Sequence, residues 1–382
     1  MAPVPASILR ALSITDPSKA SLSTSGLGSG FTSTGAIRAT VPGPDGRDEE
    51  RRYFVKTSAD GASAAAMFRG EYESLNAIAS SVPGFCPRAL AWGSLDDDDD
   101  DDDDDDPPSS PKKKSYYLLT EYLELGGSGR RASDSSPSSL AHRLAQLHST
   151  PAPPDPATGR RRFGFPVPTF CGDTPQPNRF SEDWAQFYAD ERLRAVLARS
   201  ERRNGRDGAL RALVERTAGT VVPRLLGRGH LGCDAAGKGE GIVPVVVHGD
   251  LWSGNAGRGR IVGGGGGDPA GEGAKVGDVV YDPSACYAHS EFELGIMRMF
   301  GGFGSAFFEE YHRLVPRTAP VEEYEDRVRL YELYALCLCL DGEGWRGLTC
   351  YRYHHLNHHA IFGAGYRSGA VSIMEKLLKK YG

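Results

Sequence analysis

The stretch from Val243 to Asn255 combines a short apolar run with polar residues suited to phosphoryl transfer. The valines at 245–247 predict a buried strand, and Asp250 and Asn255 follow it five positions apart. In a kinase catalytic loop, such a carboxylate accepts the proton of the attacking hydroxyl, and such a carboxamide supplies an oxygen ligand to Mg²⁺. A polar turn with an Asx cap could have the same sequence. The other parts of a kinase site must therefore decide between the two interpretations.

A lysine and a glutamate appear where a kinase would need them. Residues 51–57 predict a strand that places Lys56 near its end, and residues 64–80 carry apolar side chains at helical spacing. Glu71 lies on that helix. A lysine on a strand is usually a solvated surface residue, but a strand lysine paired with a helix glutamate is the arrangement that aims a lysine at ATP phosphates.

A glycine-rich turn precedes the lysine strand and includes Gly28, Gly30 and Gly35. Without side chains, the backbone N–H groups of such a turn can approach phosphate oxygens closely. Many Gly/Ser segments are only linkers, so the signal is weak alone. We expect these glycines to contribute to ATP binding.

Two later segments complete the kinase order. Residues 115–125 predict a strand that ends in polar residues, and the backbone near Glu121 and Leu123 is predicted to hydrogen-bond an adenine between two lobes. Residues 275–283 predict a strand that ends at Asp282, one hairpin after Asn255. A metal-binding aspartate occupies that place in kinases. An Asp-Pro pair is otherwise most simply a turn.

Composition bounds the class of protein. With 382 residues, the chain is long enough for two lobes. The net charge of −6 includes an unbroken run of eleven aspartates at 96–106, and without it 44 basic residues face 39 acidic ones. We interpret residues 95–114 as a disordered insertion in a surface loop between two strands.

Several classes of function find little support. Basic residues do not alternate with aromatic ones in a patch, so nucleic-acid binding is not expected. Apolar windows are too short to span a membrane. Seven cysteines without a CxxC pair do not form a disulfide framework, and the first 24 residues show no signal-peptide core. The cytoplasm is the predicted location.

The expected fold is α+β and bilobal, like that of protein kinases. Residues 1–125 are predicted to form a small β-rich N-lobe, and residues 126–382 a larger, mainly helical C-lobe. Histidines at 354, 355, 358 and 359 repeat at i, i+4 spacing, which could bind a metal. Without an HExxH motif, helix packing or substrate contact is the simpler interpretation.

Several strings resemble the fructosamine/ketosamine-3-kinase family, whose members share the fold of aminoglycoside and choline kinases. They are HGDLWSGN at 248–255, YDPS at 281–284, AHSEFELG at 288–295 and MFGGF at 299–303. The likeness continues upstream in FVK at 54–56 and MFRGEYESL at 67–75. It covers most of the chain, from about residue 28 onward.

This resemblance implies ATP-dependent phosphorylation of the 3-hydroxyl of ketosamines, with Mg²⁺ as cofactor. The substrates would be ribulosamine, erythrulosamine or fructosamine adducts on small amines or protein lysines, and the unstable product would release the amine, so that the chain would act in deglycation. Asp250 would be the catalytic base, and Asn255 and Asp282 would bind Mg²⁺. Trp252 would form an apolar wall beside the sugar. His289 and Glu291 would shape the acceptor pocket.

Two alternatives stay open. One is a small-molecule kinase of the aminoglycoside or choline type, which acidic residues near Asp250 would favour. The loop carries Trp252 and Ser253 instead. The other is a kinase fold that has lost catalysis and serves as a scaffold, against which the complete set of polar residues argues. A monomer or weak dimer is expected.

Overall fold

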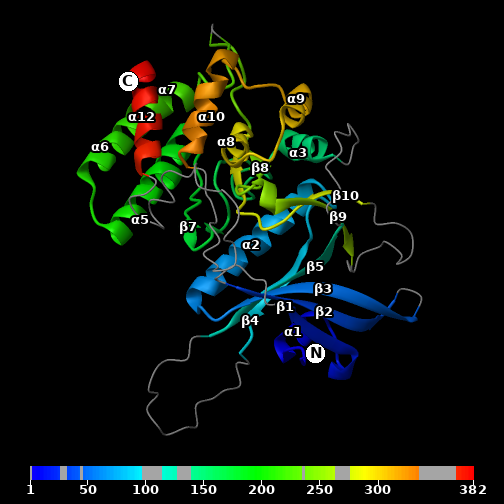
Figure 1. Cartoon of the computed structure of the whole chain (residues 1–382). Helices are drawn as coiled ribbons and strands as arrows, with labels where there is room; N and C mark the ends of the chain where they lie inside the picture. The colour runs from blue at the N-terminus through cyan, green and yellow to red at the C-terminus, as the bar shows by residue number, and fades with distance from the viewer. Residues whose placement is uncertain are drawn as a thin grey trace.

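The structure is a computed structural model that describes residues 2–25, 32–43, 46–96, 114–126, 139–234, 237–262, 276–334 and 367–382. An antiparallel sheet lies at one end of the molecule and helices gather at the other, with α2 (Ala62–Ser81) running between them (Figure 1). The α+β class, with a β-rich N-terminal part and a mainly helical C-terminal part, is confirmed. No helix within the described ranges is long and apolar enough to span a membrane.

The main sheet contains seven strands in the order β1-β2-β3-β5-β9-β10, and β4 also pairs with β5. Their bounds are β1 (Ala20–Ser25), β2 (Ser33–Pro42), β3 (Asp48–Ser58), β4 (Ala89–Ser94), β5 (Tyr116–Leu125), β9 (Ala256–Val262) and β10 (Gly277–Val280). The last four residues of β5 pair with β9, so the sheet crosses the predicted lobe boundary at 125/126. That boundary stays a prediction. The acidic insertion joins the paired strands β4 and β5, and residues 97–113 of it lie outside the described part of the chain.

Alternation along β3 sets which side chains face the site. Tyr53 and Val55 are buried against a small core that also holds Ile8 of the short helix α1 (Ala6–Ala11). Because successive side chains of a strand point to opposite faces, Lys56 points to the other face of the sheet. That face is the one on which α2 lies.

The helix α2 presents one stripe to the protein interior. Phe68, Leu75 and Ile78 are buried at helical spacing, each worth about 1.5–3 kcal/mol of hydrophobic stabilisation. Glu71 falls within the same stripe, three residues after Phe68 and four before Leu75. The apolar residues therefore fix the direction in which this one carboxylate points.

The C-terminal part is built mainly from helices. They are α3 (Leu140–Ser149), α4 (Trp184–Phe187), α5 (Ala195–Asn204), α6 (Gly208–Arg216), α7 (Val222–Leu226), α8 (Glu291–Phe300), α9 (Ser305–Leu314), α10 (Tyr324–Glu332) and α12 (Arg367–Tyr381). Segments of π-helix, which is wound more loosely than an α-helix, join α4 to α5 at Tyr188–Arg194 and α6 to α7 at Thr217–Val221. The histidines at 354–359 lie outside the described residues.

Two small strand pairs complete the C-terminal part. The strand β8 (Val245–Val247) pairs antiparallel with β11 (Cys286–Ala288), and β6 (Thr169–Cys171) pairs with β7 (Thr174–Gln176). All three residues of β8 are buried. The predicted catalytic loop thus leaves a strand that the core holds in place.

Candidate active site

Lys56 joins three separate elements at the edge of the site. Its Nζ lies 2.6 Å from Glu71 Oε1 on α2 and 2.7 Å from Asp282 Oδ1, which follows β10. Burial alone would lower the pKa of Lys56, but the charges of Asp282 and Glu71 outweigh it, and the pKa is raised. The lysine therefore stays a cation. The predicted pairing of strand lysine and helix glutamate is present.

Asp250 and Asn255 meet in the loop after β8. Asn255 Nδ2 donates to the backbone oxygen of Asp250 at 2.9 Å and to its Oδ2 at 3.0 Å. The other carboxylate oxygen, Oδ1, is buried and has no hydrogen-bond partner within the described structure. Burial, with the nearby charges of Asp282 and Glu293, raises the pKa of Asp250 well above its usual range. Such a carboxylate has the proton affinity that a general base requires.

Asp282 lies where it can share a metal with Asn255. The Tyr281 N–H donates to the Asn255 carbonyl at 3.1 Å, and Asn255 Nδ2 lies 3.5 Å from the Asp282 carbonyl. Asp282 itself has a left-handed backbone with φ of 56°, which is uncommon for a residue other than glycine. The amide nitrogen of Asn255 is turned to Asp250, so its side-chain oxygen remains for a cation. One carboxylate and one amide oxygen suit Mg²⁺, which keeps water and phosphate ligands besides.

His248 supports the same loop from within the protein. The Asp250 N–H donates to His248 Nδ1 at 3.3 Å, so His248 Nε2 carries the proton and donates to the Tyr281 carbonyl at 3.0 Å. Burial lowers the pKa of His248 to about 4, although Tyr281 and Asp282 oppose the effect. The neutral imidazole thus ties the Asp250 loop to the Asp282 loop.

Trp252 lies between Asp250 and Asn255 in the chain and is half-buried. Its ring packs against Phe300 with the ring centres 5.8 Å apart. A Cβ at Gly254 would lie 2.1 Å from the indole, so only glycine leaves the ring this position. The apolar wall predicted for Trp252 is available beside the loop, and its contact with a sugar stays a prediction.

Of the three glycines predicted to bind ATP, the structure describes only Gly35. Gly28 and Gly30 lie outside the described residues. Gly35 lies within β2, where a Cβ would meet Leu22 Cδ1 at 2.9 Å and the Ser23 carbonyl at 3.0 Å. The structure therefore explains this glycine by the close approach of β1. Its predicted contribution to ATP binding stays a prediction.

Glu121 and Leu123 lie where β5 leaves β3 and pairs with β9. The Glu121 carboxylate accepts from the Arg88 backbone N–H at 2.8 Å and from Arg88 Nε at 3.0 Å. Its side chain is thus held inside the protein. Any contact with adenine at this point would use backbone groups, as predicted.

His289 follows the strand β11, and Glu291 is the first residue of the helix α8. In the β8–β11 pairing Ala288 lies opposite Val245, so His289 follows the end of β11 that is remote from Asp250. His289 hydrogen-bonds Tyr331 Oη at 2.9 Å and Thr318 Oγ1 at 2.8 Å. The structure thus places this side chain inside the helical part, and its predicted contribution to the acceptor pocket stays a prediction.

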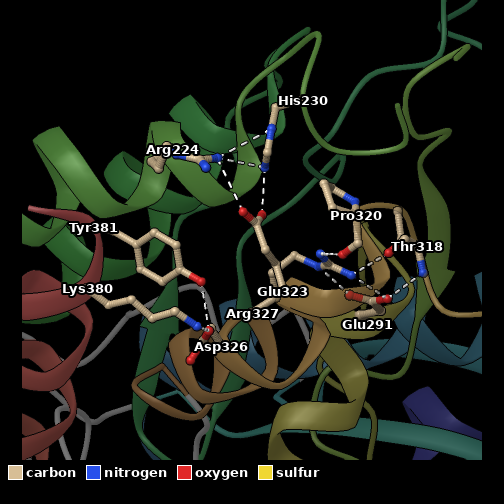
Figure 2. Close-up of polar contacts among 10 residues, drawn as sticks. All are labelled: Arg224, His230, Glu291, Thr318, Pro320, Glu323, Asp326, Arg327, Lys380 and Tyr381. Carbon is tan, nitrogen blue, oxygen red and sulfur yellow. Dashed lines mark hydrogen bonds and ion pairs between the residues drawn. The ribbon is translucent and has the colours of Figure 1, made fainter. Parts of the chain in front are cut away.

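The Glu291 carboxylate is held in the same way (Figure 2). It accepts from Arg327 Nε at 2.8 Å and from the Thr318 N–H at 2.7 Å, and both charged side chains are buried. Burial raises the pKa of Glu291, but His289 and Arg327 outweigh it, and the pKa is lowered. The ion pair fixes the segment before α10. The predicted role of Glu291 in the acceptor pocket stays a prediction.

One residue near the site was not predicted. Glu293, two positions after Glu291, accepts hydrogen bonds from the backbone N–H groups of His248 and Gly249. Residues two apart on a helix point about 200° away from each other. The string that contains both glutamates was recognised, but nothing in it tells which of them faces the loop.

Several known proteins are similar to this chain in sequence. The family model described as fructosamine kinase matches residues 32–341. Ketosamine-3-kinase of Mus musculus is 32% identical over 57% of this chain and 54% of its own length. A protein of Oryza sativa named protein-ribulosamine 3-kinase, chloroplastic, is 29% identical over 86% of this chain and 72% of its own length.

A solved structure from Thermobifida fusca, named as a candidate fructosamine-3-kinase, has a similar fold. The TM-score is 0.62 at 21% identity, and the alignment covers 98% of this chain and 99% of the other. This likeness confirms the predicted kinase-like fold. The match to the mouse protein spans little more than half of that relative.

Proposed function

Because the chain belongs to the fructosamine kinase family, we propose that it is an ATP-dependent kinase that phosphorylates the 3-hydroxyl group of ketosamines. The acceptors are ribulosamine or fructosamine adducts on small amines or on protein lysines. The names of the mouse and rice relatives support this class of substrate. Release of the amine from the phosphorylated product would make the reaction a deglycation. The cytoplasm, and a monomer or weak dimer, stay the predicted location and state.

The observation that carries the proposal is the free oxygen of Asp250. A buried carboxylate oxygen without a donor is costly, and Asp250 Oδ1 has none within the described structure. Asn255 already holds the other oxygen at 3.0 Å. A substrate hydroxyl placed at Oδ1 would supply the missing donor and would lose its proton to that atom.

The remaining polar residues suit the binding of a nucleoside triphosphate. Lys56, kept charged by Glu71 and Asp282, would bind phosphate oxygens. Asn255 and Asp282 would hold Mg²⁺, which neutralises the charge on the phosphates as they react. Phosphoryl transfer depends mainly on positioning and on charge stabilisation. These residues supply both functions from three elements of the fold.

The test is ATP turnover with Mg²⁺ against a ribulosamine and a fructosamine, each offered free and attached to a protein. Choline and kanamycin serve as control acceptors, and Asp250→Asn serves as the blank. We expect phosphorylation of a ketosamine and a loss of about 10²–10⁴-fold in kcat in the variant, because a general base contributes a factor of that order. The KM for ATP should change little.

Other outcomes separate the alternatives. Turnover with choline or kanamycin alone would assign the chain to the small-molecule kinases. Binding of ATP without turnover of any acceptor would support a scaffold. Ketosamine turnover that survives in Asp250→Asn would remove Asp250 from the proposed mechanism.

A further inference from the structure

The half-buried residues Trp252 and Ser253 of the loop after β8 lie against the end of the helix α8. Phe300, the last residue of α8, packs on the indole of Trp252, with the ring centres 5.8 Å apart. Gly301 and Gly302 follow Phe300, and Gly302 reaches Ser253. Both glycines belong to the string MFGGF. The contact therefore joins that string to the middle of the predicted catalytic loop.

Gly302 lies so close to Ser253 that a side chain would not fit between them. A Cβ at Gly302 would lie 2.5 Å from Ser253 Cβ and 2.7 Å from Ser253 Oγ. The hydroxyl oxygen could rotate to another rotamer, but the Cβ atom keeps the place that the backbone gives it. Any residue other than glycine would therefore displace the backbone on one side of this contact.

Gly301 differs from Gly302 in its surroundings. Both have a left-handed backbone, with φ of 68° at Gly301 and 83° at Gly302, and a residue with a Cβ adopts this conformation only at a cost. A Cβ at Gly301 would meet no atom of the described residues within 4 Å. The two positions thus form a matched pair, because only Gly302 combines this backbone with a close neighbour.

Packing holds the glycine turn at both ends. Met299, before the turn, is buried in the core. Phe303, after the turn, packs on Phe307 of α9 with the ring centres 5.4 Å apart. Because the turn is fixed on both sides, a side chain at Gly302 would displace mainly Ser253.

A displacement of Ser253 would reach the residues that carry the proposed chemistry. The Asn255 N–H donates to the Trp252 carbonyl at 2.9 Å, and the Trp252 N–H donates to the Asp250 carbonyl at 3.1 Å. Asn255 Nδ2 in turn donates to the Asp250 carboxylate at 3.0 Å. Hydrogen bonds thus close this loop on itself, and its parts would shift together.

Packing alone orients the indole of Trp252. Its Nε1 is buried and has no hydrogen-bond partner within the described residues. The ring lies against Phe300 and over Gly254, where a Cβ would be 2.1 Å from it. A shift of the neighbouring Ser253 would therefore move the ring, because no such hydrogen bond opposes the movement.

We propose that Gly302 is a positioning residue for phosphoryl transfer, because only glycine lets the end of α8 support Ser253 at this distance. The inference rests on the proposed kinase activity. The supported loop carries the proposed base, Asp250, and the proposed metal ligand, Asn255. Gly302 does not touch the reacting atoms and acts on them through this loop.

The first test compares Gly302→Ala with Gly301→Ala in the ketosamine assay. A displacement of about 1 Å at a catalytic group can cost about 10²-fold in rate. We expect Gly302→Ala to lower kcat/KM for the ketosamine by about that factor. The KM for the ketosamine should change more than the KM for ATP, because Lys56 belongs to β3 and stays in place.

Gly301→Ala is the matched control. It introduces the same kind of backbone strain into the turn without a contact to Ser253, and it should keep kcat/KM within about threefold of wild type. Equal losses in Gly301→Ala and Gly302→Ala would attribute the effect to strain in the turn and would overturn the proposal. So would a Gly302→Ala enzyme with wild-type kinetics.

A rescue experiment separates the contact from general stability. Ser253→Gly removes both Ser253 atoms that a Cβ at Gly302 would approach most closely. In the Ser253→Gly background, Gly302→Ala should therefore lower kcat/KM by less than about threefold, against about 10²-fold in wild type. The effect of Gly301→Ala should be the same in both backgrounds. An equal loss from Gly302→Ala in both backgrounds would contradict the inference.

Hydrogen exchange gives a measurement that needs no substrate. The N–H groups of Trp252 and Asn255, which close the loop, should exchange faster in Gly302→Ala than in Gly301→Ala, while those of α2 keep their wild-type rates. Should wild type phosphorylate no ketosamine, the proposed function fails, yet these rates still decide whether Gly302 holds the loop. Equal rates in the two variants would overturn the inference.

If Gly302→Ala does not fold, the contact can be tested from the side of Ser253. Ser253→Ala keeps the Cβ atom that faces Gly302, and Ser253→Gly removes it. We expect the N–H groups of Trp252 and Asn255 to exchange faster in Ser253→Gly than in Ser253→Ala, because the loop loses its support on α8. Equal exchange in these two variants would show that the loop does not depend on the contact.

Discussion

Lys56 Nζ lies 2.7 Å from a carboxylate oxygen of Asp282, although 226 positions separate the two residues in the chain. The same nitrogen lies 2.6 Å from Glu71. One cation therefore holds a strand, a helix and the loop after β10 together, in the place where phosphate groups are proposed to bind. Without it, two carboxylates would face each other, which is unfavourable for like charges.

Replacing this cation should abolish most of the proposed activity. We expect Lys56→Met to lower kcat/KM for ATP by about 10²–10³-fold, because a charge-stabilising donor contributes about 2.7–4 kcal/mol to the transition state. Steady-state kinetics with varied ATP measure it. Lys19→Met, which removes an exposed pair with Asp48, should have no effect. Activity of Lys56→Met within threefold of wild type would contradict the assignment.

Elements with strong local patterns could be predicted from the sequence. The apolar spacing along α2 and the three valines of β8 report burial directly, so both elements were located within a few residues. The strand β1 (Ala20–Ser25) was missed, because Ser, Thr and Ala give no apolar alternation. Its conformation comes from pairing with β2. The pairing of β5 with β9 was also not predicted, because such contacts join distant parts of the chain.

For the candidate site, the sequence indicates which polar residues belong to it but not how every side chain is oriented. Lys56, Glu71, Asp250, Asn255 and Asp282 occur in an order that indicates a kinase, and the structure brings them together. Glu291 and Glu293 share one string, yet one binds Arg327 and the other accepts the Gly249 N–H. Which of two glutamates faces which neighbour depends on the rotation of α8 in the core. Sequence pattern alone does not give that rotation.

The buried pair of Glu291 and Arg327 should matter for stability and not for substrate binding. Glu291→Ala leaves the Arg327 guanidinium buried without its carboxylate, which costs about 3–5 kcal/mol. Urea denaturation measures that loss, and the KM for the ketosamine should stay unchanged. The exposed pair of Glu182 and Arg160 provides the control Glu182→Ala. A tenfold higher KM at unchanged stability would support the predicted place of Glu291 in the acceptor pocket.

Trp252 should affect binding of the acceptor and not binding of the nucleotide. Its indole packs on Phe300, and the predicted role of this ring is to offer an apolar face to the C–H groups of a sugar. We expect Trp252→Ala to raise the KM for the ketosamine about tenfold, equivalent to about 1.4 kcal/mol, with the KM for ATP unchanged. Trp252→Phe keeps a ring and should recover part of the loss. Equal effects of Trp252→Ala on both KM values would point to a displaced loop instead.

Glu293 should make the stability of the protein depend on pH. Its pKa rises from 4.5 to about 7 on folding because of burial, so the folded protein binds a proton that the unfolded chain releases. Between these two values, stability therefore falls as pH rises. At about 1.4 kcal/mol per pKa unit, the change between pH 5 and 8 amounts to about 2–3 kcal/mol.

Urea denaturation at pH 5 and pH 8 tests this sign. Glu293→Gln has no carboxyl group to ionise, so its stability relative to wild type should improve by about 2–3 kcal/mol from the lower to the higher pH. Glu191→Gln, measured alongside, should show no such trend. A pH-independent difference between Glu293→Gln and wild type would mean that Glu293 keeps one protonation state across this range.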